Sequence, residues 1–110
     1  TPYWDMQESI KDWLATRGFG YTTEKAKADY VLVIRSSSRK YNTMSNGTQT
    51  TYYSYVDANV SIQKKNADKP VYDNKLSIKG SFLKSYNEAA YVAYRDMENK
   101  LLKILEDNIK

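Results

Sequence analysis

The dipeptide Asn46-Gly47 lies between two long stretches of strand-forming residues, and it constrains the fold more than any other feature of the sequence. Asn and Gly tolerate the positive φ angles of a two-residue type I′ turn, so the dipeptide predicts a tight antiparallel hairpin. Paired positions in an antiparallel ladder sum to a constant, which fixes the register. The predicted register pairs Ser45 with Thr48, Thr43 with Thr50, Tyr41 with Tyr52, Lys40 with Tyr53 and Ser38 with Tyr55.

The strand that returns from this turn alternates between an apolar and a polar face, as a half-buried strand does. The apolar face begins at Val56 and continues through Ala58, Val60 and Ile62. Residues 39–53 contain almost no aliphatic side chains. We therefore expect the tip of the hairpin to project beyond the core.

Further strands are predicted on both sides of the hairpin. Residues 30–34 are apolar on both faces, which is typical of a central strand. After a turn over residues 65–70, a third long strand has Lys75, Ser77 and Lys79 pointing outward, and Gly80 indicates a bulge or a close backbone approach near its end. Residues 19–23 are predicted to form a short strand, followed by a helical turn over residues 24–29.

Two amphipathic helices are predicted at the ends of the chain. Residues 5–17 carry apolar side chains at helical spacing, and Gly18 gives a left-handed stop. Ser85 and Glu88 form a capping box at the start of the second helix. The apolar stripe of this second helix contains Ala90, Ala93, Tyr94, Met97, Leu101, Ile104 and Leu105.

These elements predict a single α+β domain over residues 1–110. Both helices have one apolar stripe and need the same face of the sheet. The expected architecture is a two-layer sandwich, in which two helices cover one face of an antiparallel sheet of three long strands plus a short strand. The other face is then left to water or to a partner.

The chain has no histidine and no cysteine, which removes the commonest general base, the usual zinc ligands and thiol nucleophiles. No dense cluster of carboxylates suggests an all-oxygen metal site. We therefore expect a protein that is not an enzyme, with no cofactor, no bound metal and no evident small-molecule substrate.

The net charge of +4 arises in the middle of the chain, where residues 30–84 carry 9 basic and 3 acidic side chains. Tyrosine is abundant, with 11 residues against 2 Phe and 2 Trp, and it suits partly wet interfaces. The basic and aromatic side chains of the hairpin could serve a protein interface or a glycan surface, or they could track the backbone and stack the bases of a nucleic acid. They could also merely stiffen an exposed hairpin. The candidate partner-binding residues are Arg39, Lys40, Tyr41, Tyr52, Tyr53 and Tyr55.

Several segments occur in a recognisable order, namely Gly18-Phe19, Ala28-Asp29-Tyr30-Val31-Leu32-Val33, Val60-Ser61-Ile62, Lys69-Pro70-Val71-Tyr72 and the alanine-rich Glu88-Ala89-Ala90-Tyr91-Val92-Ala93-Tyr94. With them, the order of elements over about residues 10–105 resembles small domains of bacterial envelope lipoproteins, such as the curli-secretion lipoprotein and the amino-terminal domain of the Tol-Pal translocation protein. The long tyrosine-rich hairpin departs from that pattern. The resemblance implies a non-catalytic scaffold that binds other envelope proteins or itself.

From this resemblance we expect a periplasmic or outer-membrane-associated interaction or assembly domain. The partner is expected to be an envelope protein or a second copy of the chain, and the alternative is a nucleic-acid-binding module that uses the basic hairpin. No apolar run approaches the ~20 residues of a membrane span. Thr1, with no initiator methionine, suggests a mature or trimmed chain, so any membrane anchor is expected to lie outside residues 1–110.

Overall fold

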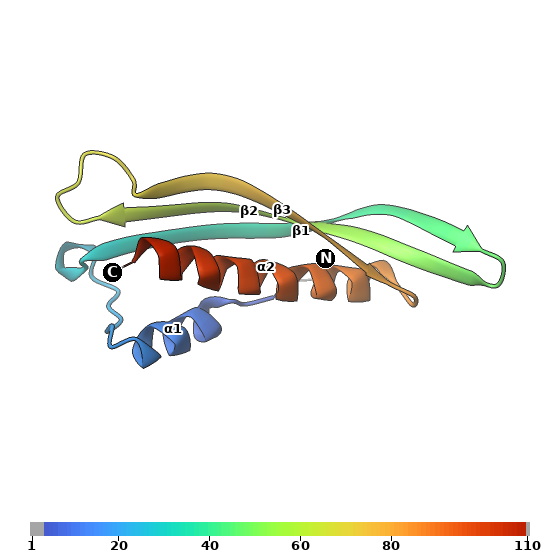
Figure 1. Ribbon diagram of the computed structural model, residues 1–110, viewed down its shortest axis with the longest axis horizontal. Coiled ribbons are helices and arrows are strands. Elements are labelled where there is room, and N and C mark those ends of the chain that lie inside the picture. The colour runs from blue at the N-terminus through green and yellow to red at the C-terminus, as the bar shows by residue number, and fades with distance from the viewer. Residues whose placement is uncertain (1–3, 110) are drawn as a thin grey trace.

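A computed structural model describes residues 4–109 of the chain (Figure 1). Three long strands, β1 (Tyr30–Asn46), β2 (Gln49–Lys64) and β3 (Tyr72–Phe82), form one antiparallel sheet in the order β1-β2-β3. The α+β class and the long antiparallel strands predicted from the sequence are therefore confirmed. In chain order the elements are helix α1 (Gln7–Thr16), a short 3-10 helix η1 (Lys25–Lys27), strands β1 (Tyr30–Asn46), β2 (Gln49–Lys64) and β3 (Tyr72–Phe82), and helix α2 (Tyr86–Asn108).

The central strand of the sheet is β2, and the prediction that residues 30–34 form the central strand is wrong. Each long strand is joined to the next by a short connection, so each pairs with its neighbour in sequence and the middle one lies between the others. On β2 the predicted apolar face is buried from Val56 to Ile62. Residues 30–34 belong to an edge strand instead, and Val33 is 41% exposed.

The hairpin turn lies one residue later than predicted. Asn46 pairs with Gln49, so the two turn residues are Gly47 and Thr48. Positive φ at this turn is confined to Gly47, at +65°. A type I′ turn needs two residues with positive φ, whereas a type II′ turn needs one, at its first position. Gly47 occupies the first position of this turn, so its positive φ fits a type II′ turn.

A bulge changes the register of the hairpin again. Lys40 pairs with Ser54, but Thr43 pairs with Tyr52, so two residues of β1 lie opposite one residue of β2. All five predicted pairs are therefore wrong. The observed partners are Thr50 for Ser45, Tyr52 for Thr43, Ser54 for Lys40 and Val56 for Ser38, while Tyr41 lies in the bulge. Beyond the bulge the ladder continues without interruption to Tyr30 and Lys64.

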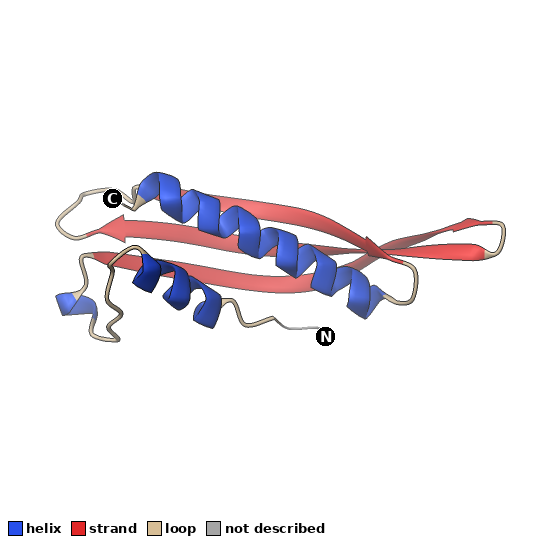
Figure 2. Ribbon diagram, turned by 60° about the horizontal axis from the view of Figure 1, so that its bottom comes forward, coloured by secondary structure: helices blue, strands red, loops and turns tan. Residues whose placement is uncertain are grey.

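Both helices lie on the same side of the sheet (Figure 2). Helix α2 runs along β2 and β3, and α1 lies beside β1, while the tip of the β1–β2 hairpin extends past the end of α2 as expected (Figures 1 and 2). The core lies between α2 and the sheet. Its most deeply buried apolar side chains are Val56, Val60, Ile62, Ala93, Tyr94, Met97, Leu101 and Leu105.

Helix α2 begins at the predicted cap and lies very close to β3. The Ser85 hydroxyl oxygen accepts a hydrogen bond from the Glu88 amide at 3.1 Å. The buried Ser54 hydroxyl of β2 donates to the carbonyl of Tyr86 at 2.8 Å, which ties the start of the helix to the sheet. Gly80 pairs regularly with Ser54, so it marks a close backbone approach rather than a bulge.

Helix α1 is shorter than the predicted span of residues 5–17, and Gly18 follows it in the left-handed conformation, with φ +84°. Residues 19–23, predicted as a short strand, form a loop without strand pairing. The helical turn predicted over residues 24–29 is the 3-10 helix η1. Short alternating runs need a neighbouring strand to become a strand themselves, and this loop has none among the described residues.

Candidate functional site

The bulge in β1 divides the six candidate residues between the two faces of the sheet. Directly paired residues of neighbouring strands lie on the same face. Lys40 and Tyr52 are on the face that α2 covers, because Lys40 pairs with buried Ser54. The face turned away from the helices, here called the outer face, carries the other candidates, which are Arg39, Tyr41, Tyr53 and Tyr55.

The outer-face candidates form a connected group of aromatic rings and cations. The rings of Tyr41 and Tyr55 meet edge to face, with centres 5.1 Å apart and an interplanar angle of 79°. The Arg39 guanidinium lies 4.3 Å from the centre of the Tyr55 ring. The Lys79 ammonium of β3 lies 5.2 Å from the centre of the Tyr53 ring and 5.9 Å from that of Tyr41. We call these five residues the outer aromatic cluster.

Lys79 is the member of the outer aromatic cluster that sequence reasoning missed. Its outward direction was predicted from the alternation of β3, but its place beside the tyrosines depends on the pairing of Lys79 with Tyr55. The sequence did contain a signal for this neighbour. An outward lysine near the end of β3 must lie beside the outward residues of the strand that pairs with β3.

Asp57 holds the cluster's arginine in place. The Arg39 Nε atom donates to an Asp57 carboxylate oxygen at 2.8 Å, and the Ser77 hydroxyl donates to the other oxygen at 2.6 Å. The hydrogen bond from Arg39 lowers the pKa of Asp57 below its ordinary value, partial burial opposes this, and the Ser77 hydroxyl adds to the lowering. The same hydrogen bond raises the pKa of Arg39. The guanidinium is thereby fixed over the Tyr55 ring.

Replacement of Asp57 by Asn is expected to cause a small, pH-dependent loss of stability. A carboxyl group whose pKa is lowered in the folded state stabilises the fold above its unfolded pKa, and this stabilisation disappears as the pH falls through the folded pKa. Urea unfolding should therefore show a gap between wild type and Asp57→Asn at neutral pH that closes below about pH 4, where unfolded aspartate titrates. Asp68→Asn, in an exposed loop, is the control. An equal gap at every pH would contradict the ionic role of Asp57.

Lys40 and Tyr52 contact the start of α2. The Tyr52 and Tyr86 rings meet edge to face with centres 5.1 Å apart, and the Lys40 ammonium lies 5.4 Å from the centre of the Tyr86 ring. Together with the Ser54 hydrogen bond to Tyr86, these contacts fasten the first turn of the helix to the hairpin. The geometry gives these two residues a structural position, away from the outer aromatic cluster.

The outer aromatic cluster offers binding chemistry in the form of half-buried rings, hydroxyl groups and two cations. Within residues 4–109 no group of acidic side chains is arranged to hold a metal ion. Over the same residues, neither helix combines the length and the hydropathy that crossing a membrane requires.

No protein-family model matches the chain, and no curated protein is significantly similar to it.

Proposed function

We propose that the chain is a non-catalytic interaction or assembly domain of the bacterial cell envelope, in the periplasm or at the outer membrane. In this proposal the helices and the sheet form a two-layer sandwich with both helices on one face, which leaves the outer face to a partner. The partner is an envelope protein or a second copy of the chain. The observation that carries the proposal is the outer aromatic cluster, which lies on the face turned away from both α1 and α2.

The arrangement of the cluster suits a protein surface. Tyrosine and arginine are enriched at protein interfaces, and they dominate the binding energy there. Tyr41 and Tyr55 hold each other edge to face, and Arg39 is held by Asp57. Side chains that are ordered before binding lose less conformational entropy when a partner arrives. The envelope location is supported by the resemblance of the sequence to envelope lipoprotein domains.

Binding of single-stranded nucleic acid is the alternative, because rings and cations occur together in the cluster. The charges of the cluster favour a nucleic acid less than they favour a protein partner. Arg39 already neutralises Asp57, so Lys79 is the cluster's remaining cation. The tip of the hairpin adds hydroxyl and amide groups, not the dense cations that a phosphate backbone needs. The tip residues of this kind are Thr43, Ser45, Thr48, Gln49, Thr50 and Thr51.

Removal of two of the outer rings should strongly weaken partner binding while the fold remains. The double variant Tyr41→Ser/Tyr53→Ser is expected to lose about 1–2 kcal/mol of stability, because cross-strand contacts are individually weak. Proteins captured from an envelope extract by the wild-type chain would be identified, purified and titrated against both proteins by calorimetry. We expect the affinity of the double variant to fall by about tenfold or more, as is typical of interface tyrosines.

The matched control is Leu83→Ser/Tyr91→Ser, which removes two large exposed side chains, one of them a tyrosine ring, outside the cluster. It should bind the purified partner like the wild type. Equal losses in the two double variants, or no loss in either, would remove the outer aromatic cluster from the interface. Tight, salt-sensitive binding of a labelled oligothymidylate by the wild type would replace the proposal with the nucleic-acid alternative.

A further inference from the structure

The first part of β1 is apolar on both faces although it lies at an edge of the sheet. Tyr30, Leu32 and Ile34 face the helices, whereas Val31 and Val33 lie on the outer face. Natural sheet edges are usually protected by lysine, proline or a bulge, since an exposed edge recruits other strands. The edge strand β3 follows this rule, with outward Lys75 and Lys79, but residues 30–34 of β1 contain no charged side chain.

Helix α1 extends past this unprotected edge. An α-helix with its side chains is about 10–12 Å wide, so two parallel helices cover about 20–24 Å. Strands lie about 4.8 Å apart, so the sheet is only about 14 Å wide. Since α2 lies over β2 and β3, α1 reaches beyond β1 (Figure 2). By these typical widths, two helices side by side cover at least one strand more than the three strands of this sheet.

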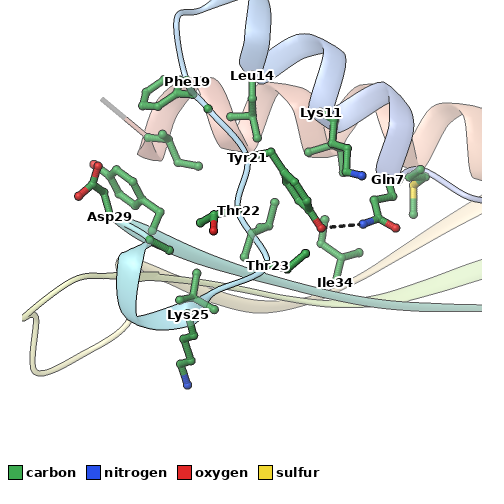
Figure 3. A pocket seen from close by; sticks show the side chains of 18 of the residues that line it. Gln7, Lys11, Leu14, Phe19, Tyr21, Thr22, Thr23, Lys25, Asp29 and Ile34 are labelled. Carbon is green, nitrogen blue, oxygen red and sulfur yellow. Dashed lines mark hydrogen bonds between the residues drawn. The ribbon is translucent and has the colours of Figure 1, made fainter.

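A cavity of about 850 Å³ lies between α1, the loop that follows it and β1. Ile34 on one side and Leu14 and Phe19 on the other line its apolar part (Figure 3). Tyr21 reaches from the loop towards α1, where the Gln7 amide donates to its hydroxyl at 3.0 Å and the Lys11 ammonium lies 4.1 Å from the centre of its ring. The volume is within the range of about 300–1,000 Å³ that is usual for binding cavities.

We propose that the edge of β1 over residues 30–36 binds an extended segment of a partner protein as a fourth strand. Its backbone pairs with β1, and its inward side chains are apolar and enter the cavity beneath α1. An acidic side chain on its outer face pairs with Arg35, which is exposed and forms no ion pair among the described residues. In such strand addition the main chain gives affinity, and the alternate side chains give specificity.

A foreign strand fits this edge better than a second copy of the chain. Two β1 strands paired antiparallel about a two-fold axis place their helices on the same side of the joined sheet. Both copies of α1 would then extend over the same boundary and compete for the same space. The edge therefore accepts a strand that brings no helix with it.

The probe for this edge is the acetylated and amidated peptide Thr-Glu-Val-Thr-Val-Thr-Val. Paired antiparallel with β1, it places Glu beside Arg35 and its Val side chains towards the cavity. Amide chemical shifts of the labelled full chain would be followed up to about 1 mM peptide, where even weak complexes are populated. We expect shifts confined to β1, α1 and the loop between them. No shifts, or shifts elsewhere, would overturn the proposal.

Two modified peptides distinguish strand addition from simple filling of the cavity. One is N-methylated on every Val, and the other on Glu and the two Thr residues that alternate with Val. Successive amides of a strand point to opposite sides, so only one modified peptide loses the hydrogen bonds to β1. We expect its affinity to be about tenfold or more lower than that of the other. Equal affinities would overturn the proposal.

Charge exchange at Arg35 tests the predicted acidic partner residue. Arg35→Glu should weaken binding of the peptide by about threefold or more, and a peptide with Lys in place of Glu should recover it. Lys100→Glu makes a similar charge change on the exposed side of α2 and should leave binding unchanged. If the charge exchange did not restore affinity, the register that places the acidic residue of the peptide beside Arg35 would be wrong.

The same experiments separate this edge from the outer aromatic cluster. Tyr41→Ser/Tyr53→Ser should bind the peptide like the wild type. Peptide binding at β1 therefore stands or falls independently of partner binding by the outer aromatic cluster. Sedimentation of the unliganded chain should show no self-association that depends on Arg35. A dimer whose formation Arg35→Glu abolishes would identify a second copy as the occupant and overturn the proposal of a foreign strand.

Discussion

Leu101→Ala is expected to lower the free energy of unfolding by about 2–5 kcal/mol. Leu101 lies in the middle of α2 and is 1% exposed, within the cluster that α2 forms with β2 and β3. Its truncation removes buried apolar surface and leaves a cavity that the tightly paired strands cannot close. Urea denaturation of the purified variant measures the loss.

Lys100→Ala is the matched control, because Lys100 is the neighbouring residue and is exposed. Its effect on the unfolding midpoint should be small, since surface substitutions usually change stability by less than about 0.5 kcal/mol. Equal destabilisation of the two variants would mean that α2 is rotated about its axis, so that Leu101 is no more buried than Lys100.

Gly80→Ala is expected to destabilise the protein although it adds only one methyl group. A Cβ atom at residue 80 would lie within 2.6 Å of the Ala93 amide nitrogen and closer still to the Ala89 carbonyl oxygen. Both neighbours are backbone atoms of α2, so the helix must move away from β3 as a whole. Overpacking of this kind typically costs about 1–3 kcal/mol.

Gly20→Ala is the control for this second experiment. Apart from its chain neighbours, nothing in residues 4–109 lies within 4 Å of a Cβ at residue 20, which belongs to the loop after α1. Alanine at such a position should be neutral or slightly stabilising, because it restricts the unfolded chain. Wild-type thermal stability in Gly80→Ala would show that α2 does not lie directly on β3.

The helices illustrate how much a local pattern can predict. The start of α2 at Ser85 and its buried stripe around Leu101 agree with the sequence, because capping and the helical period depend only on residues within a few positions. The alternating face of β2 was predicted for the same reason. The prediction of a short strand over residues 19–23 is wrong because strand formation depends on a neighbour that the local sequence does not contain.

The candidate site was predicted only in part. The sequence indicated the right hairpin and the right residue types, but it paired Tyr41 with Tyr52. The bulge places Tyr41 on the outer face, whereas Tyr52 contacts Tyr86 on the helix side. A shift of one residue moves a side chain to the opposite face, so small errors in register have large consequences for a surface. Lys79 joins the cluster through a pairing between strands that no local pattern reveals.

The sequence by itself determined the class of the fold, the positions of the long elements and the projecting hairpin, because propensity, periodicity and turn chemistry act between residues close in the chain. The tertiary structure decided that residues 30–34 lie at an edge, that Gly80 meets α2, and which tyrosines share a face with Arg39. These features depend on contacts between distant segments. An apolar strand has the same sequence pattern whether its second neighbour is present or is supplied by another molecule.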